Sequence, residues 1–440
     1  MTAIPDKTYD VIVAGGGPAG MIAAIASARN GAHTLLIERS ECLGGTATSG
    51  LLCNWGAFDN ADRRNDFARM RLYEDNQPWP DELKNEGERI IKGIPEEMLI
   101  RMQSVGAASK IPLGYISINP EYLKIIADEM VRQAGAEIIY GISALSAERT
   151  NNEWAVDTCS KSGQVIFKTR QVIDASGDAD LARFAGAEIV RGRQSDGTMQ
   201  PPTLVFMIGN ANVRESDVYL SLNKNFREAT GRKMGCWTPV PLMPGVFSIN
   251  NLHSPGVDGC SPWDVSHAVE HCRREAIELT ELFRRNIPGC ENVFLIDTAP
   301  SLGIRETVRI VGDYTLTEDD VLSARKFPDG ICRYAHNIDV HLPDAHLDKL
   351  ENHGFVPAGS DYHVPYKCML PKNLDDFLVA GRTISATHFA AGSARVMPCC
   401  MAIGQAAGTA AALSVKMNTT PRKLPVDTLI GTLLDQGVCL

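Results

Sequence analysis

The twelve cysteines of the sequence include no Cys-x-x-Cys pair, and the single close pair is Cys399-Cys400. Adjacent cysteines are poor common metal ligands and poor disulfide partners, so the usual zinc and dithiol motifs are excluded. We therefore expect most of the cysteines to be buried as small apolar side chains. Internal repeats and low-complexity tracts are also missing.

An excess of basic residues is missing as well. Lys and Arg number 43 against 53 Asp and Glu, which argues against nucleic acid as a partner, because phosphate binding depends mainly on Lys and Arg. Residues 1–7 contain neither a basic segment followed by an apolar one nor an Arg- and Ser-rich transit segment. A cytoplasmic protein is the simplest prediction.

One long apolar run is present, at residues 394–415, with no charged residue after Arg395. Its length is close to that of a membrane-spanning helix, and Gly404-x-x-x-Gly408 also occurs in membrane helix dimers. However, Gly404, Gln405, Gly408 and many alanines favour close backbone packing over a surface that faces lipid. We predict that this run is a helix packed inside the protein, with no membrane insertion.

The 440 residues are too many for one ordinary core, which favours two or three structural units. Residues 9–14 predict a strand, residues 21–29 a helix and residues 34–37 a second strand, which together form a β-α-β unit. Further on, residues 137–145, 154–159, 165–168 and 171–175 each predict a strand.

The turn of the first unit carries Gly15-x-Gly17-x-x-Gly20, and Glu38 ends its second strand. Gly15 permits the tight turn, Gly17 allows the backbone to approach a pyrophosphate, and Gly20 lets the helix pack against the strand. The N-terminus of the helix faces the phosphates, and Glu38 can accept a hydrogen bond from a ribose hydroxyl. This pattern predicts a dinucleotide site, although the glycines alone do not separate FAD from NAD.

The small-residue segment 41–50 follows directly and resembles the FAD-binding loop of the glutathione-reductase-type flavoprotein superfamily. In the disulfide reductases of that superfamily, the positions of Ala47 and Leu52 are a redox-active cysteine pair, so disulfide exchange at the flavin is not expected here. Thr46 to Ser49 includes no His that could attach FAD covalently, and we expect the cofactor to be non-covalent.

Five later stretches extend the resemblance. Residues 172–182 are similar to the strand and turn that return to the FAD domain. Asp178 as a helix cap is the other interpretation, and both can hold at once because capping and cofactor approach use the same turn. Residues 301–321, together with segments 366–372, 380–382 and 395–398, resemble a family of FAD-dependent oxidoreductases often left without an assigned substrate, more distantly related to succinate dehydrogenase and fumarate reductase flavoproteins. The motif and the resemblance together indicate these cofactor-binding residues: Gly15, Gly17, Pro18, Ala19, Gly20, Glu38, Arg39, Gly44, Gly45, Thr46, Ala175, Gly177, Asp178, Gly381, Arg382, Arg395, Val396 and Met397.

Candidate catalytic residues are His341, His388, Arg305 and Tyr366. A His or Tyr would remove the proton that accompanies hydride transfer, although a single His is more often structural than catalytic. Arg305 and Arg395 could hold an anionic group of the substrate or stabilise reduced flavin, and an ion pair with Glu306 or another acid is the alternative. His336-x-x-Asp339-x-His341 supplies no complete coordination shell, so no metal site is predicted.

The fold class predicted is α/β, with a discontinuous Rossmann-like FAD-binding domain (residues 1–55, 115–190 and 365–440) and an inserted α+β substrate domain (residues 56–114 and 191–364). The function predicted is hydride transfer from a small polar substrate, with a CH–OH, CH–NH or activated C–H group, to flavin N5. The alternatives are a reductase of a C=C bond and a non-catalytic binding protein of the same fold. No second Gly-x-Gly-x-x-Gly follows a strand, which favours oxygen, a quinone or a protein carrier as electron acceptor; homo-oligomerisation is left open.

Overall fold

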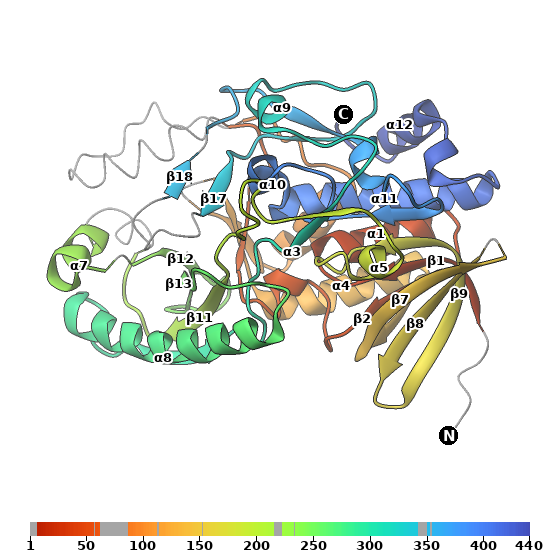
Figure 1. Ribbon diagram of the computed structural model, residues 1–440. Coiled ribbons are helices and arrows are strands. Elements are labelled where there is room, and N and C mark those ends of the chain that lie inside the picture. The colour runs from red at the N-terminus through yellow and green to blue at the C-terminus, as the bar shows by residue number, and fades with distance from the viewer. Residues whose placement is uncertain are drawn as a thin grey trace.

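The computed structural model describes residues 7–440 except 57, 62–86, 112–113, 152, 215–221, 233, 342–349 and 353. Its main sheet contains seven strands from the described residues, and Figure 1 shows them at the lower right. β1 (Thr8–Ala14) lies at the centre and pairs in parallel with β2 (Thr34–Glu38) and with β9 (Gly163–Asp174). Beyond β2, the sheet adds β6 (Glu137–Tyr140) in parallel.

β9 is long enough to have two neighbours on one side. Its first part pairs with β8 (Glu153–Ser160), which is followed by β7 (Ile142–Thr150), both antiparallel. Its last three residues pair in parallel with β20 (Phe377–Val379). One sheet therefore joins strands from three distant parts of the sequence, and the parallel strands end at a common edge. The α/β fold class and the parallel strands of the prediction are confirmed, whereas the domain boundaries stay a prediction.

The two faces of the sheet are covered by different layers. Val11 and Val13 point into a core shared with α1 (Pro18–Arg29) and α11 (Met397–Lys416), whereas Ile12 and Ala14 point into a second core beneath β7, β8 and β9. Both faces of β1 are buried from Val11 to Ala14, which explains why this part of the strand is entirely apolar. α3 (Ile94–Ser104) and α4 (Pro120–Ala134) complete the helical layer.

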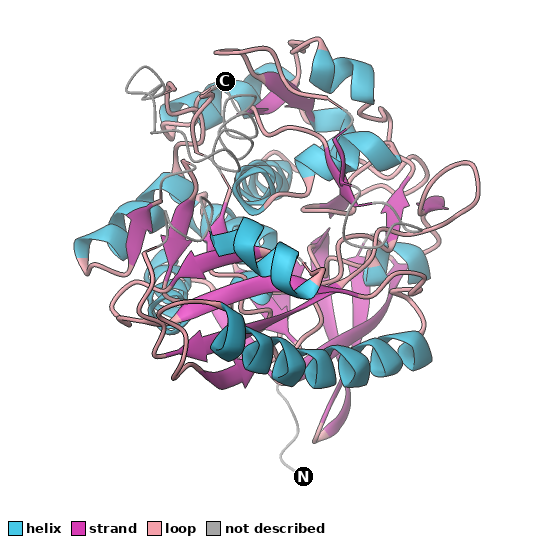
Figure 2. Cartoon of the chain, turned by 90° about the vertical axis from the view of Figure 1, so that its left-hand side faces the viewer, coloured by secondary structure: helices cyan, strands magenta, loops and turns pink. Residues whose placement is uncertain are grey.

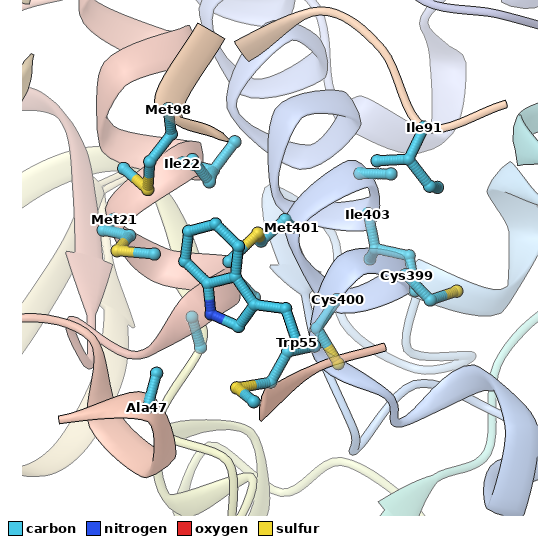
Figure 3. Close-up of a cluster of buried hydrophobic side chains, with 14 of the residues drawn as sticks. Met21, Ile22, Ala47, Trp55, Ile91, Met98, Cys399, Cys400, Met401 and Ile403 are labelled. Atoms are coloured by element: carbon cyan, nitrogen blue, oxygen red, sulfur yellow. The ribbon is translucent and has the colours of Figure 1, made fainter. Parts of the chain in front are cut away.

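Trp55 fills the space between the first turns of α1 and α11. Its side chain is fully buried, and Figure 3 shows the indole ring flanked by Met21 of α1 and Met401 of α11. Each large buried aromatic ring contributes a few kcal/mol through buried apolar area, about 25 cal/mol per Å². The packing fixes the two helices at the ends where their free backbone N–H groups lie.

A second region contains an antiparallel sheet in the order β12 (Cys236–Pro239), β13 (Phe247–His253), β11 (Thr203–Gly209) and β14 (Phe294–Thr298). α8 (Pro262–Asn286) packs across it, and Figure 2 shows this long helix along the lower side of the molecule. The remaining elements are η1 (Gly45–Ala47), β3 (Asn54–Trp55), β4 (Ala108–Lys110), β5 (Ile116–Ile118), α5 (Asp180–Phe184), β10 (Ile189–Arg191), α7 (Asn223–Thr230), β15 (Val308–Ile310), α9 (Glu318–Leu322), β16 (Gly330–Tyr334), β17 (Asp339–His341), β18 (Leu350–Asn352), β19 (Tyr362–Pro365), η4 (Tyr366–Met369), α10 (His388–Ala394), η5 (Pro421–Lys423) and α12 (Val426–Asp435).

Candidate active site

A cavity of about 170 Å³ opens where β1, β2 and β9 end and α1 begins. This is the edge at which open α/β sheets bind ligands. The predicted cofactor residues that line it are Gly15, Gly17, Pro18, Ala19, Glu38, Arg39, Gly45, Thr46, Ala175, Gly177, Asp178, Gly381, Arg382, Arg395 and Met397.

The glycines of the first turn have the three uses that the motif predicts. Gly15 has a φ of +95°, and a Cβ there would lie 2.6 Å from the carbonyl oxygen of Ala175. A Cβ on Gly20 would lie 1.7 Å from the carbonyl oxygen of Gly15, whereas a Cβ on Gly17 would meet no protein atom within 4 Å. Gly17 therefore faces open space, which suits the close approach of a pyrophosphate. Gly20 and Gly44 do not line the cavity: Gly20 allows helix packing, and Gly44 packs against Thr48.

Two helices direct free N-termini toward the site. Neither α1 nor α11 has a side-chain cap or an acidic residue in its first turn. The free N–H groups and the positive end of the helix dipole therefore remain available to an anion. Gly17, Pro18 and Met397 line this cavity at these helix ends. The predicted cofactor residue Val396 lines only the second cavity described below, which Met397 borders as well.

Glu38 is buried at the end of β2 and is held by backbone and side-chain donors. The Gly16 N–H donates to its Oε2 at 2.5 Å, and the backbone N–H and hydroxyl of Ser40 donate to its Oε1, each at 2.7 Å. Each carboxylate oxygen can accept more than one hydrogen bond, so Glu38 keeps acceptor capacity for a ribose hydroxyl. The cradle, the helix N-termini and this acid together fit FAD.

Asp178 forms an ion pair with Arg382 and accepts a hydrogen bond from the Thr307 hydroxyl at 3.1 Å. It does not cap α5, because Asp174 and Ser176 accept the N–H groups of that helix. Burial raises the pKa of Asp174. Of the two roles left open by the sequence, the structure thus places Asp178 at the cavity wall.

A second cavity of about 280 Å³ continues from the first and shares Thr46, Gly50, Ile304, Arg382, Arg395 and Met397 with it. Its walls come from segments far apart in the chain, and most of the side chains on them are polar. The further lining residues are Leu52, Asn54, Gly56, Tyr115, Thr203, Val205, Cys236, Asn250, Gly303, Arg305, His336, Asn337, Asp339, His341 and Val396. We call this second cavity the polar chamber.

Arg305 enters the polar chamber from the turn before β15. Its guanidinium donates to the Pro201 carbonyl at 2.8 Å, to the Thr203 hydroxyl, and to Nε2 of His253 at 3.2 Å. Burial, together with the charge of Arg395, lowers the pKa of Arg305 to about 9, which leaves it charged at neutral pH. The predicted alternative, an ion pair with Glu306 or another acid, is wrong for Arg305, because Glu306 pairs with Arg309 and His388 and no other described acid pairs with Arg305. The alternative is confirmed for Arg395, which pairs with Asp339.

His341 and Asp339 lie on one face of β17, as alternation along a strand predicts. Nε2 of His341 lies 3.5 Å from Oδ1 of Asp339, whose other oxygen is 3.2 Å from Arg395. Burial and the nearby Arg305 lower the pKa of His341, despite the opposing charge of Asp339. For Asp339, burial is outweighed by His341 and Arg395, which hold its pKa well below the ordinary range.

Two predicted catalytic residues lie outside both cavities. His388 is 4 % exposed, and its Nδ1 lies 2.9 Å from Glu306 in a buried cluster that also includes Arg309. Tyr366 is 2 % exposed, and its hydroxyl donates to the Pro421 carbonyl at 3.0 Å. The charge of Glu306 and the open carbonyl of Pro421 draw these side chains into the protein interior, so the prediction of a catalytic role is corrected for both.

His253 was missed by the sequence analysis, as were Thr203 and Asn250 of the neighbouring strands. His253 ends β13 and stacks on His341 with ring centroids 4.8 Å apart. No local motif surrounds it, and only the antiparallel pairing of β11 with β13 brings Thr203 opposite it. Among the residues that the structure describes, no group of three or more His, Cys, Asp or Glu could hold a metal ion.

A model of the protein family described as FAD dependent oxidoreductase matches residues 10–433. Two curated relatives are digeranylgeranylglycerophospholipid reductases: that of Methanocaldococcus jannaschii is 31% identical over 189 residues, or 41% of each chain, and that of Thermoplasma acidophilum is 29% identical over 186 residues, or 42% of this chain and 43% of the relative. The aligned part thus spans less than half the length of these relatives.

Solved structures with a similar course of the chain include a geranylgeranyl bacteriochlorophyll reductase-like protein of Thermoplasma acidophilum, with a TM-score of 0.44 and 13% identity over 98% of this chain and 84% of the other. Glycine oxidase from Geobacillus kaustophilus gives a TM-score of 0.41 and 14% identity over 94% and 95% of the two chains. The family match covers nearly the whole chain, and the cavity at the strand ends fits the cofactor: this protein belongs to the FAD dependent oxidoreductase family and is an enzyme that uses FAD.

Proposed function

We propose that the enzyme oxidises a small polar substrate in the polar chamber. FAD would supply the hydride acceptor, its N5 atom, and the substrate would carry a CH–OH, CH–NH or activated C–H group. The observation that carries this proposal is that the chamber opens onto the nucleotide cavity through shared residues, among them Thr46, Arg395 and Met397. A substrate in the chamber would meet whatever part of the cofactor reaches this junction.

His341 is the proposed proton acceptor. Its lowered pKa keeps the ring neutral near pH 7, as a base requires, and Asp339 beside it stays ionised. The Asp339 charge stabilises the imidazolium that forms when His341 takes a proton. Arg395 is the second partner of Asp339, which holds that carboxylate in place.

Reduction of a C=C bond is the second candidate, because the archaeal relatives are reductases of an unsaturated glycerophospholipid by name. The lining of the polar chamber offers charged and amide side chains for a polar group of a substrate, and apolar side chains such as Leu52, Val205 and Met397 for a hydrocarbon part. If the enzyme is a reductase, we expect an unsaturated substrate that carries a polar group.

Anaerobic titration of the purified FAD-loaded enzyme separates these functions. Loss of the oxidised-flavin absorbance on addition of small alcohols, hydroxy acids or amines supports oxidation. Flavin that no donor bleaches, but that small unsaturated acids reoxidise after dithionite reduction, shows a reductase instead. A colourless protein that cannot be reconstituted with FAD contradicts both functions and leaves the non-catalytic binding protein.

We further propose that the protein works in the cytoplasm. Within the described part of the chain, α11 alone is long and apolar enough to cross a membrane, and 94% of the relevant window is buried. Its packing against α1 supports a core helix over an inserted one.

We also propose that oxygen, a quinone or a protein carrier accepts the electrons. Rapid reoxidation of the reduced enzyme by air would identify an oxidase, and reoxidation only by quinones or carriers would identify a dehydrogenase.

A further inference from the structure

Arg305 differs from the other two arginines that line the polar chamber, Arg382 and Arg395, in having no acidic partner. Arg395 is paired with Asp339 and Arg382 with Asp178, whereas the hydrogen-bond partners of Arg305 are a carbonyl, a hydroxyl and an imidazole. No carboxylate among the described residues forms an ion pair with it. The charge of Asp339 also acts on Arg305, but that carboxylate is already paired with His341 and Arg395. A cation that faces a cavity without an ion pair of its own is suited to bind an anion.

We propose that the substrate is a small carboxylate, that Arg305 binds its carboxyl group, and that His253 and Thr203 position Arg305 without neutralising it. This inference rests on the proposed function, because it assigns the substrate class of the same chamber. It selects a hydroxy acid or another carboxylate with an oxidisable C–H over a simple amine, because an ammonium ion would be repelled by Arg305.

His253 is suited to this positioning role by its protonation state. Its Nε2 accepts from Arg305, which places the ring proton on Nδ1, and Nδ1 donates to the Asn251 carbonyl at 3.1 Å. Burial and the charge of Arg305 also hold the pKa of His253 well below its ordinary range. A neutral imidazole orients the guanidinium, whereas a carboxylate in its place would cancel the charge that the substrate needs.

Two other polar atoms of the chamber wall point to a ligand with donors and acceptors. Oδ1 of Asn250 and Nε of Arg395 are buried and have no hydrogen-bond partner in the described part of the structure. Both residues line the polar chamber with Arg305. Buried polar atoms are rarely left unpaired, and a substrate with a carboxylate and a hydroxyl can satisfy an acceptor and a donor together.

The test is binding, measured without turnover. Propionate, oxalate and benzoate, each beside its neutral amide, are titrated into the oxidised FAD-loaded enzyme by calorimetry and by the flavin spectrum. We expect saturable binding of at least one acid, with its amide at least about 10-fold weaker. Arg305→Gln should weaken binding of the acid about 10- to 100-fold, as expected for the loss of a charged hydrogen bond, and leave binding of the amide unchanged. Arg191→Gln is the control: Arg191 is exposed and paired with Asp258, and this variant should bind the acid as the wild type does.

The His253 variants test positioning. His253→Gln retains a hydrogen-bond acceptor and should keep acid binding within about 10-fold. His253→Phe leaves an Arg305 N–H without its acceptor and should lose acid binding while FAD content and amide binding are retained. Equal affinities for acid and amide, or wild-type acid binding by Arg305→Gln, overturn the inference. Flavin reduction by amines or simple alcohols, without any preference for carboxylates, would overturn the carboxylate inference and leave the proposed function standing. Strong carboxylate binding with no flavin reduction by any donor would contradict the proposed oxidation alone.

Discussion

Gly404 of α11 lies against Ala19 of α1 so closely that a Cβ on Gly404 would come within 2.1 Å of the Ala19 carbonyl oxygen. Gly408 stands in the same relation to Ala23, one turn further along both helices. The Gly-x-x-x-Gly spacing thus serves close packing of two buried helices, which share Trp55 at their N-terminal ends. The same contact holds the N-terminus of α1 beside the FAD cavity.

Gly404→Ala should therefore destabilise the protein and weaken FAD binding together. The Cβ meets backbone that cannot move aside, so we expect a fall in the free energy of unfolding of about 3 kcal/mol, at the upper end for an overpacked core. Urea unfolding with bound and free FAD measures both effects.

Gly431→Ala in α12 is the matched control, because nothing lies within 4 Å of a Cβ at this exposed helical position. Alanine there should stabilise the protein by about 0.5–1 kcal/mol through helix propensity. A Gly404→Ala protein as stable as wild type would show that α1 and α11 are further apart than described.

Gly17→Ala should separate stability from cofactor binding. Gly17 has a φ of −67°, which alanine adopts freely, and its Cβ would point into open space beside the α1 N-terminus. We expect the free energy of unfolding of the FAD-free protein to change by less than about 0.5 kcal/mol, while the Kd for FAD rises at least about 10-fold because the pyrophosphate can no longer approach the backbone.

Calorimetry of the FAD-free protein and a fluorescence titration with FAD provide the two measurements. Gly15→Ala serves as comparison, since its positive φ and its contact with Ala175 predict loss of stability as well. Normal FAD affinity in Gly17→Ala would place the pyrophosphate elsewhere.

The first β-α-β unit of the nucleotide site could be predicted because the glycines and Glu38 lie close together in the sequence at a characteristic spacing. The walls that come from distant segments, such as residues 175–178 and 380–382, were found only through the resemblance. Strand limits were less accurate: the predicted strand at residues 137–145 is divided at Gly141, whose φ is +66°, into β6 and β7. Conversely, residues 165–168 and 171–175 were predicted as two strands, and pairing with both β8 and β1 joins most of them in β9.

The polar chamber could be predicted only in part, because its walls are assembled from β11, β13, β17 and the turns before β15 and α11. Arg305, Arg395 and His341 were found through a resemblance that runs along the chain. His388 and His253 look alike in the sequence, and only long-range partners distinguish them: Glu306 holds His388 in the interior, whereas Arg305 holds His253 at the chamber.

His341 should impose an acid limb on the rate of flavin reduction by substrate. Its pKa is lowered from 6.5 in the folded protein, so the neutral base is present at neutral pH and is lost as the pH falls, with a midpoint below 6.5. His341→Gln should reduce the rate about 10²- to 10⁴-fold and remove this limb. Anaerobic stopped-flow measurements between about pH 4.5 and 8 give the rate of flavin reduction and its dependence on pH.

The free energy of unfolding should also fall as the pH falls. The unfolded state binds the proton more readily than the folded one, so His341 lowers stability progressively as the pH falls below 6.5, and His341→Gln should lessen that slope. His271→Gln, at an exposed position on α8, should leave the acid limb unchanged. A midpoint at or above 6.5, or an acid limb that persists in His341→Gln, would assign the proton transfer to another group.

Met397→Asp tests whether the α11 N-terminus faces the flavin. Reduction adds negative charge to the flavin, which the free N–H groups and the helix dipole of α11 would stabilise. A carboxylate in this first turn opposes that charge and should lower the two-electron potential by on the order of 30 mV, equivalent to about 1.4 kcal/mol. Met397→Asn has a side chain of the same shape as Asp without its charge and should shift the potential far less. Spectroscopic titration against a reference dye compares the two, and equal potentials in FAD-loaded Met397→Asp and Met397→Asn would mean that the charge at this helix end does not reach the flavin.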